Sequence, residues 1–155
     1  LSVGGGQIVF PATANPSANA NTLDDYEEGT WTPVLNFAGD TTGITYTSRA
    51  ASYEKIGRTV VLHMYFQLSS KGTGVGAARV TGLPFASAST ASLYNVLTLR
   101  LAVLTGISGM VQAYVLSGSS QLDQMEYLGT GTITQIGNSQ FTDTTDPMIG
   151  GSYGV

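Results

Sequence analysis

The sequence contains no cysteine and little charge. None of its 155 residues is Cys, and Asp, Glu, Lys and Arg together make up 10% of the chain, against about a quarter in average globular proteins. The absence of cysteine excludes disulfides and thiolate metal sites. The scarcity of charge argues against a solvated helical bundle, because the exposed faces of such helices usually carry Lys and Glu.

Basic residues and a targeting segment are also missing. Only six Lys and Arg occur, spread singly, and the formal net charge is -4. Because no basic patch is present to release counterions from phosphates, we expect no nucleic-acid partner. The chain begins at Leu1 with neither the basic nor the apolar region of a secretory signal. We therefore expect a fragment or a processed product of a larger protein.

Long apolar runs are absent as well. Residues 96–116 come closest to a membrane span, but Arg100, Gln112 and a Gly-Ile-Ser-Gly break at 106–109 interrupt them. Two strands around a turn fit this pattern better than one helix, so we expect no membrane insertion.

Period-2 alternation dominates from Trp31 onward. The clearest example is TVVLHMYFQL at 59–68, in which Val60, Leu62, Met64, Phe66 and Leu68 share one face. Leu97, Leu99, Leu101 and Val103 form a second apolar face, and Met110, Gln112, Tyr114 and Leu116 share a face of a third segment. Further predicted strands are 31–37, 43–47, 51–56, 77–83, 121–128, 130–136 and 148–154.

The gaps between these segments carry turn chemistry, such as Gly39-Asp40, Ser117-Gly118 and Gly137-Asn138. Roughly nine short strands at this spacing predict an all-β fold, an antiparallel β-sandwich or jelly roll over residues 23–155. Few lysines protect the strand edges against pairing with other chains, which favours an oligomer.

Residues 1–22 are predicted to form an extended N-terminal linker or tail. Three consecutive glycines at 4–6 and two prolines at 11 and 16 argue against regular structure. Ile8 and Phe10 are apolar, so we expect the tail to pack on a neighbouring subunit or on an upstream domain.

Four carboxylates, Asp24, Asp25, Glu27 and Glu28, stand close together in NTLDDYEEGTWTPVL. Thr22-Leu-Asp-Asp fits the capping pattern at the N-terminus of a helix, and Gly29 stands where a helix often ends. Together they predict a solvated helical turn. A small glycan hydrolase using these carboxylates is the alternative, but local adjacency does not establish the separations that such enzymes need. The spacing of an EF-hand calcium loop is absent.

Other candidate sites are weaker. His63 is the only histidine, so it belongs to no histidine cluster, and a surface or interface position is expected for it. The glycines at 72, 74 and 76 lack the spacing of nucleotide-binding motifs and predict a hairpin loop. We expect neither a metal nor another cofactor.

The aromatic residues are more informative. Eight tyrosines and one tryptophan accompany many neutral hydroxyl and amide side chains. Aromatic faces stack on the C–H faces of sugars, and the polar groups bond sugar hydroxyls. The candidate carbohydrate contacts are Trp31, His63, Tyr65, Tyr94 and Tyr127. The alternative for most of these residues is a core or interface position, and Trp31 in particular is a candidate core anchor where the domain begins.

Three blocks of sequence carry a resemblance to a known class of proteins. They are GQIVFPATANPSANANTLDDYEEGTWTPVL, SYEKIG at 52–57 and VTGLPF at 80–85. In order and spacing they resemble blocks of the C-terminal modules of tail fibre and tailspike proteins of tailed bacteriophages and prophages. The resemblance covers residues 7 to about 85, and residues 86–155 carry no motif of this kind.

The resemblance implies a homotrimeric β-sandwich or jelly roll at the distal end of a virion tail, joined to an upstream domain of the same fibre or spike. It implies trimerisation and binding of host cell-surface polysaccharide or lipopolysaccharide, without catalysis, because the matching motifs are not catalytic ones. A purely structural trimerisation or folding module without a ligand is the main alternative.

Overall fold

We describe the fold from a computed structural model of the chain. It describes residues 4–6, 8–13, 15, 17–19, 21–91, 93–122, 124–128 and 133–155, the stretch 124–128 as backbone only. Within these residues the regular structure consists of eleven strands and two short 3-10 turns.

The strands fall into two groups, a long hairpin in the middle and shorter strands around it. They are β1 (Tyr26–Thr30), β2 (Val34–Phe37), β3 (Ile44–Ile56), β4 (Thr59–Lys71), β5 (Ala78–Thr81), β6 (Asn95–Ala102), β7 (Met110–Val115), β8 (Gln121–Leu122), β9 (Gln124–Leu128), β10 (Ile133–Gln135) and β11 (Asp146–Gly154). The 3-10 turns are η1 (Gly4–Gly6) and η2 (Asn138–Gln140).

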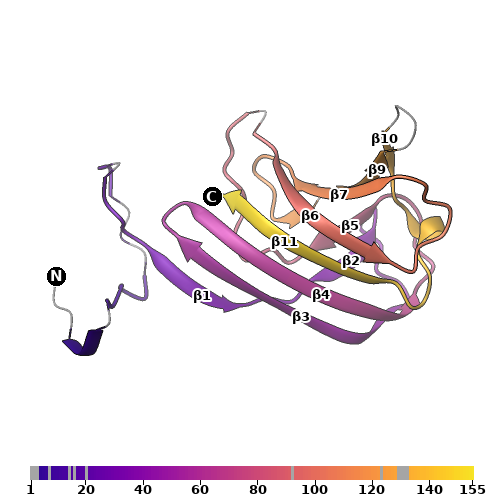
Figure 1. The fold of residues 1–155 in the computed structure, drawn as a ribbon, viewed down its shortest axis with the longest axis horizontal. Helices are drawn as coiled ribbons and strands as arrows, with labels where there is room; N and C mark the ends of the chain where they lie inside the picture. The colour runs from indigo at the N-terminus through magenta and orange to yellow at the C-terminus, as the bar shows by residue number, and fades with distance from the viewer. Residues whose placement is uncertain are drawn as a thin grey trace.

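The strands form two sheets. Eight pair in the order β1-β3-β4-β11-β6-β7-β9-β10, and three pair in the order β2-β5-β8. All described pairings are antiparallel. The smaller sheet lies behind the middle of the larger one (Figure 1). This sandwich-like, antiparallel arrangement confirms the predicted all-β class.

The core lies between the two sheets and follows the alternation of β4. Val60, Leu62, Met64, Phe66 and Leu68 are all buried, as the pattern predicts, and they pack in one cluster. Burying each such side chain stabilises the fold by about 1.5–3 kcal/mol. From the other layer the cluster receives Leu35, Phe37, Ala78, Val80 and Leu122.

The small sheet covers only one face of the large sheet. On β4 the opposite face carries Thr59, Val61, His63, Tyr65 and Gln67, which are exposed or half-buried. Residues of the neighbouring strands that pair with these positions lie on this uncovered face as well, because cross-strand partners point to the same side of a sheet. We call this uncovered side of β1, β3, β4, β11, β6 and β7 the outer face.

The last strand is central rather than peripheral. β11 pairs with β4 on one side and with β6 on the other. Its Tyr153 is 1% exposed, and its hydroxyl donates to the backbone carbonyl of Phe85 at 3.0 Å. The C-terminal strand therefore joins the two halves of the large sheet.

Two strand predictions need correction at β3. The segments 43–47 and 51–56 were predicted as separate strands, but β3 runs unbroken from Ile44 to Ile56. Its register against β4 shifts between Thr45 and Tyr46 and again between Tyr46 and Ser48. A bulge absorbs the irregular stretch without ending the strand, since its partner β4 is equally long.

The predicted helical turn around the four carboxylates is wrong. Asp24 and Asp25 lie in an irregular segment, and Tyr26–Thr30 form β1, an edge strand paired with β3 from Tyr26↔Ile56 to Thr30↔Ser52. One isolated helical turn is marginally stable in water, whereas pairing with β3 satisfies backbone groups along an existing edge. Tertiary pairing thus overrides the local capping pattern.

Residues 96–116 form two strands around a turn, as predicted. β6 pairs with β7 through Asn95↔Val115, Val96↔Tyr114 and Leu97↔Ala113. No helix in the described part of the chain is long and apolar enough to cross a membrane.

The described N-terminal residues before β1 run away from the sandwich (Figure 1). Packing of this tail on a neighbour stays a prediction.

Candidate functional site

The four carboxylates of residues 24–28 each have a structural partner. Asp24 accepts a hydrogen bond from the backbone N–H of Ser17 at 2.5 Å, and Asp25 pairs with the Lys55 ammonium. The Asp25 and Lys55 side chains are only 13% and 12% exposed. This ion pair fixes the start of β1 against β3.

The two glutamates bond tyrosine hydroxyls. Glu28 accepts from the Tyr26 hydroxyl at 2.8 Å, and Glu27 accepts from the Tyr53 hydroxyl. The hydrogen bond to Glu27 raises the pKa of Tyr53, because it stabilises the neutral phenol. Since Glu27 and Glu28 alternate along a strand, they point to opposite faces of the sheet. The carboxylates of Glu27 and Glu28 therefore do not converge on one place.

The three sequence blocks meet in one aromatic and ionic cluster. The Tyr53 and Phe85 rings pack edge-on, with centroids 5.4 Å apart at 84°, and the Lys55 ammonium lies 5.5 Å from the Phe85 ring centroid. On the β1 side, Gly29 leaves room for Tyr53, because a Cβ at Gly29 would lie 2.9 Å from the ring. The blocks thus meet in packing and pairing contacts.

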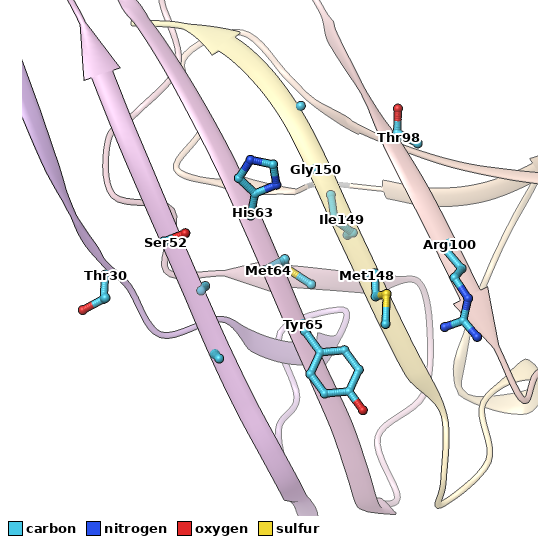
Figure 2. A pocket seen from close by; sticks show the side chains of 13 residues that line it. Thr30, Ser52, His63, Met64, Tyr65, Thr98, Arg100, Met148, Ile149 and Gly150 are labelled. Atoms are coloured by element: carbon cyan, nitrogen blue, oxygen red, sulfur yellow. The ribbon is translucent and has the colours of Figure 1, made fainter.

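A hollow lies elsewhere, on the outer face of the large sheet. Its volume is about 870 Å³, and β3, β4, β11 and β6 contribute most of its lining. One row of cross-strand neighbours runs from Ser52 through His63 and Gly150 to Thr98. The adjacent row runs from Ala50 through Tyr65 and Met148 to Arg100. Figure 2 shows these side chains on one side of the sheet.

Small residues give the hollow its depth. Ala50 and Gly150 present little or no side chain, whereas His63, Tyr65 and Met148 project from neighbouring positions of the same face (Figure 2). A Cβ at Gly150 would lie only 3.2 Å from Nδ1 of His63. The imidazole therefore rests against the backbone of β11, and a larger residue at Gly150 would displace it.

Charge is unevenly distributed across the outer face. Arg100, with a side chain 58% exposed, lies at the β6 side, and its Nη1 is 3.6 Å from Oδ1 of Asp146. At the β1 side a smaller hollow of about 360 Å³ includes Glu28 and Glu54, which are direct cross-strand neighbours. Between Arg100 and the two glutamates, the outer face carries hydroxyl, imidazole, methyl and thioether groups.

Part of the outer face is apolar and exposed. Met148 is 45% exposed, Val96 66% and Met110 68%. These three side chains come from β11, β6 and β7, three successive strands of the large sheet. Among the described residues, no group of three His, Asp or Glu side chains is placed to hold a metal ion.

The predicted sugar contacts fall in different places. His63 and Tyr65 both line the hollow. Tyr94 is 57% exposed, and its ring is 6.2 Å from that of Tyr114. Trp31 is 9% exposed and belongs to the core, so its position is that of the core anchor considered as the alternative. Tyr127 lies in β9, and its side chain is outside the described residues.

Sequence reasoning missed Ser52, Thr98, Arg100, Met148 and Gly150. Alternation in 96–103 and in 148–154 places Thr98, Arg100, Met148 and Gly150 on the face opposite the buried residues, which is a usable signal for exposure, and Ser52 belongs to the predicted strand 51–56. It does not reveal that three distant strands are neighbours, because register between distant strands is a long-range property.

Neither a protein family model nor a curated protein sequence matches the chain. Among solved structures, the chain is similar to the crystal structure of the Dettilon tailspike protein (gp208), with 17% identity and a TM-score of 0.62. The match covers 83% of this chain and 24% of that protein, so the chain spans about a quarter of its length. At this identity the likeness shows the fold: the sandwich-like arrangement of this chain also occurs within a phage tailspike protein.

Proposed function

We propose that this chain is a non-catalytic module of a phage tail fibre or tailspike, which assembles as a homotrimer at the distal end of the tail. In this proposal its outer face binds the host cell-surface polysaccharide or lipopolysaccharide, and an upstream domain of the same fibre connects it to the virion. The fold shared with part of a tailspike protein supports the tail context.

The hollow on the outer face is the observation that carries the binding proposal. Tyr65 and Met148 offer apolar surface to the C–H face of a sugar ring. Ser52, Thr98 and His63 offer hydroxyl and imidazole groups to sugar hydroxyls, from the adjacent row of the same sheet. The site is open and its lining carries one charged side chain, Arg100, so it suits a neutral, hydroxyl-rich ligand.

The non-catalytic part of the proposal rests on the carboxylates. Asp25 is paired with Lys55, and Glu27 and Glu28 accept hydrogen bonds from tyrosines. A general acid usually needs a raised pKa in a dry pocket near its substrate. The hollow does not include any of these residues among its lining.

Assembly into trimers explains how weak individual sites would hold a virion to a cell. Three sites on one rigid tip bind together with an avidity that exceeds each single affinity. Light scattering of the full chain at micromolar concentration tests this part. We expect a mass three times that of the monomer, and a monodisperse monomer would contradict the homotrimer.

The binding proposal is tested by presenting the full chain to an array of bacterial O-antigen and capsular polysaccharides. We expect binding to a subset of them, weakened about three- to tenfold by Tyr65→Ala if the ring stacks on a sugar. Tyr26→Ala is the matched control, because Tyr26 is 42% exposed but lies outside the hollow. Equal loss in both variants, or no binding to any polysaccharide, would count against the site.

A purely structural module is the second candidate, and the exposed side chains of Met148, Val96 and Met110 favour it. If the outer face is a subunit interface, Met148→Lys should reduce the assembly to smaller species. If the outer face binds sugar, the same variant should keep its oligomeric state and lose polysaccharide binding. Light scattering and the array, applied to this one variant, separate the two functions.

A further inference from the structure

The outer face of β6 continues beyond the hollow. Leu97 and Leu99 of β6 are buried in the core, so Val96, Thr98 and Arg100 point to the outer face. Tyr94 stands two residues before Val96 and has the same parity. Thr98 and Arg100 line the hollow, whereas Val96 and Tyr94 lie outside it.

An aromatic pair marks the far end of this row. Val96 pairs across the strands with Tyr114 of β7. The Tyr94 and Tyr114 rings are 6.2 Å apart and inclined at 74°. Tyr94 is 57% exposed and Val96 is 66% exposed. The edge of one ring meets the face of the other, which leaves aromatic surface of Tyr94 in solvent.

The distance between Tyr94 and Thr98, which lines the hollow, determines what kind of ligand contacts both. A strand rises about 3.4 Å per residue, so Tyr94 lies roughly 14 Å from Thr98 along the direction of β6. A single sugar ring cannot contact both, whereas a chain of several sugars can. Val96 between them offers a methyl surface, and the cross-strand partners Tyr114 and Gly150 are uncharged. Between Tyr94 and Thr98 the named side chains are uncharged, and Arg100 follows at the hollow itself.

We infer that Tyr94 forms a second aromatic subsite, and that the ligand of the outer face is an internal segment of a polysaccharide chain lying along β6. This inference rests on the proposed function and adds the form of the ligand to it. The hollow beside Tyr65 holds one part of the chain, and the Tyr94–Tyr114 pair contacts a part several sugars away.

The test uses each polysaccharide that the array identifies, hydrolysed and separated into fractions of two, four and eight sugars. Affinity of the full chain for each fraction is measured by calorimetry, together with the Tyr94→Ala variant. We expect affinity to rise from the two-sugar to the longer fractions. Tyr94→Ala should weaken binding of the eight-sugar fraction about three- to tenfold and leave the two-sugar fraction unchanged.

Tyr26→Ala is again the matched control, because Tyr26 is an exposed tyrosine on β1, at the opposite side of the outer face. It should not alter the length dependence. Equal affinity for two and eight sugars, or equal weakening of all fractions by Tyr94→Ala, would overturn the second subsite and leave the proposed function intact. Absence of binding to every polysaccharide on the array would overturn the proposed function and this inference together.

Discussion

The hydroxyl of Tyr153, the third residue from the end of the sequence, donates a hydrogen bond to the backbone carbonyl of Phe85 at 3.0 Å. Phe85 in turn packs against Tyr53, which bonds Glu27. A chain of contacts thus joins the last strand to the first. The three sequence blocks and the C-terminal strand are thus packed against one another.

Tyr153 is predicted to make stability depend on alkaline pH. Burial raises the pKa of Tyr153 to about 12 from the ordinary 10.0. Because the folded pKa is the higher one, its contribution is fully present below pH 10 and is lost as pH rises through 12. A difference of two pKa units corresponds to about 2–3 kcal/mol of unfolding free energy.

The measurement compares urea unfolding of the native chain and Tyr153→Phe, followed by the fluorescence of Trp31, the single buried tryptophan. The variant should lose about 1 kcal/mol at pH 7, for the missing hydrogen bond. Between pH 10 and 12 the native chain should lose more stability than the variant. Parallel decline of the two proteins would contradict the assignment to Tyr153.

Gly29→Ala is expected to destabilise the fold by about 1–3 kcal/mol. The added Cβ would lie 2.9 Å from the Tyr53 ring, which also packs edge-on against Phe85. Gly154→Ala is the matched control, since its Cβ would meet only Arg58 O, at an ordinary 3.8 Å. Denaturant midpoints of the two variants give the comparison, and a Gly29 variant as stable as the control would disprove the tight packing.

The alternation of apolar and polar residues along the sequence was sufficient to predict most strands. A strand with one buried face carries an apolar residue at every second position, and this pattern is visible locally. The core face of Val60 to Leu68 is the clearest case. The hollow could not be predicted, because Tyr65 meets Met148 only through the pairing of β4 with β11. Local pattern also failed at β1, where a capping motif competes with an available sheet edge. For Trp31, composition was compatible with both a sugar contact and a core anchor. Only its burial in the folded chain decides for the core anchor.

The Asp25–Lys55 pair is predicted to be energetically coupled. Both side chains are nearly buried, so removal of one partner leaves an uncompensated charge. Asp25→Ala and Lys55→Met should each cost about 2 kcal/mol or more, and the double variant should cost less than the sum. A double-mutant cycle by urea unfolding measures this coupling. Additive losses would mean that the two charges are screened by water.

Val103→Gly is expected to stabilise the chain. Val103 has a φ of 59°, a left-handed conformation that is strongly unfavourable for a β-branched residue. The strain persists because the carbonyl of Val103 accepts hydrogen bonds from the hydroxyls of Thr142 at 3.1 Å and Thr145 at 3.0 Å. Its side chain is 53% exposed, so little burial is lost on substitution.

Relief of such strain contributes about 1–3 kcal/mol, and the added chain entropy of glycine costs about 0.5–1 kcal/mol. A net gain of about 1 kcal/mol should therefore appear as a higher urea midpoint. Val96→Gly is the matched control: Val96 is also exposed, but it lies in the regular strand β6, where glycine should destabilise. If both variants lose stability alike, the backbone at Val103 is not strained, and the threonine hydrogen bonds hold a conformation that valine adopts without cost.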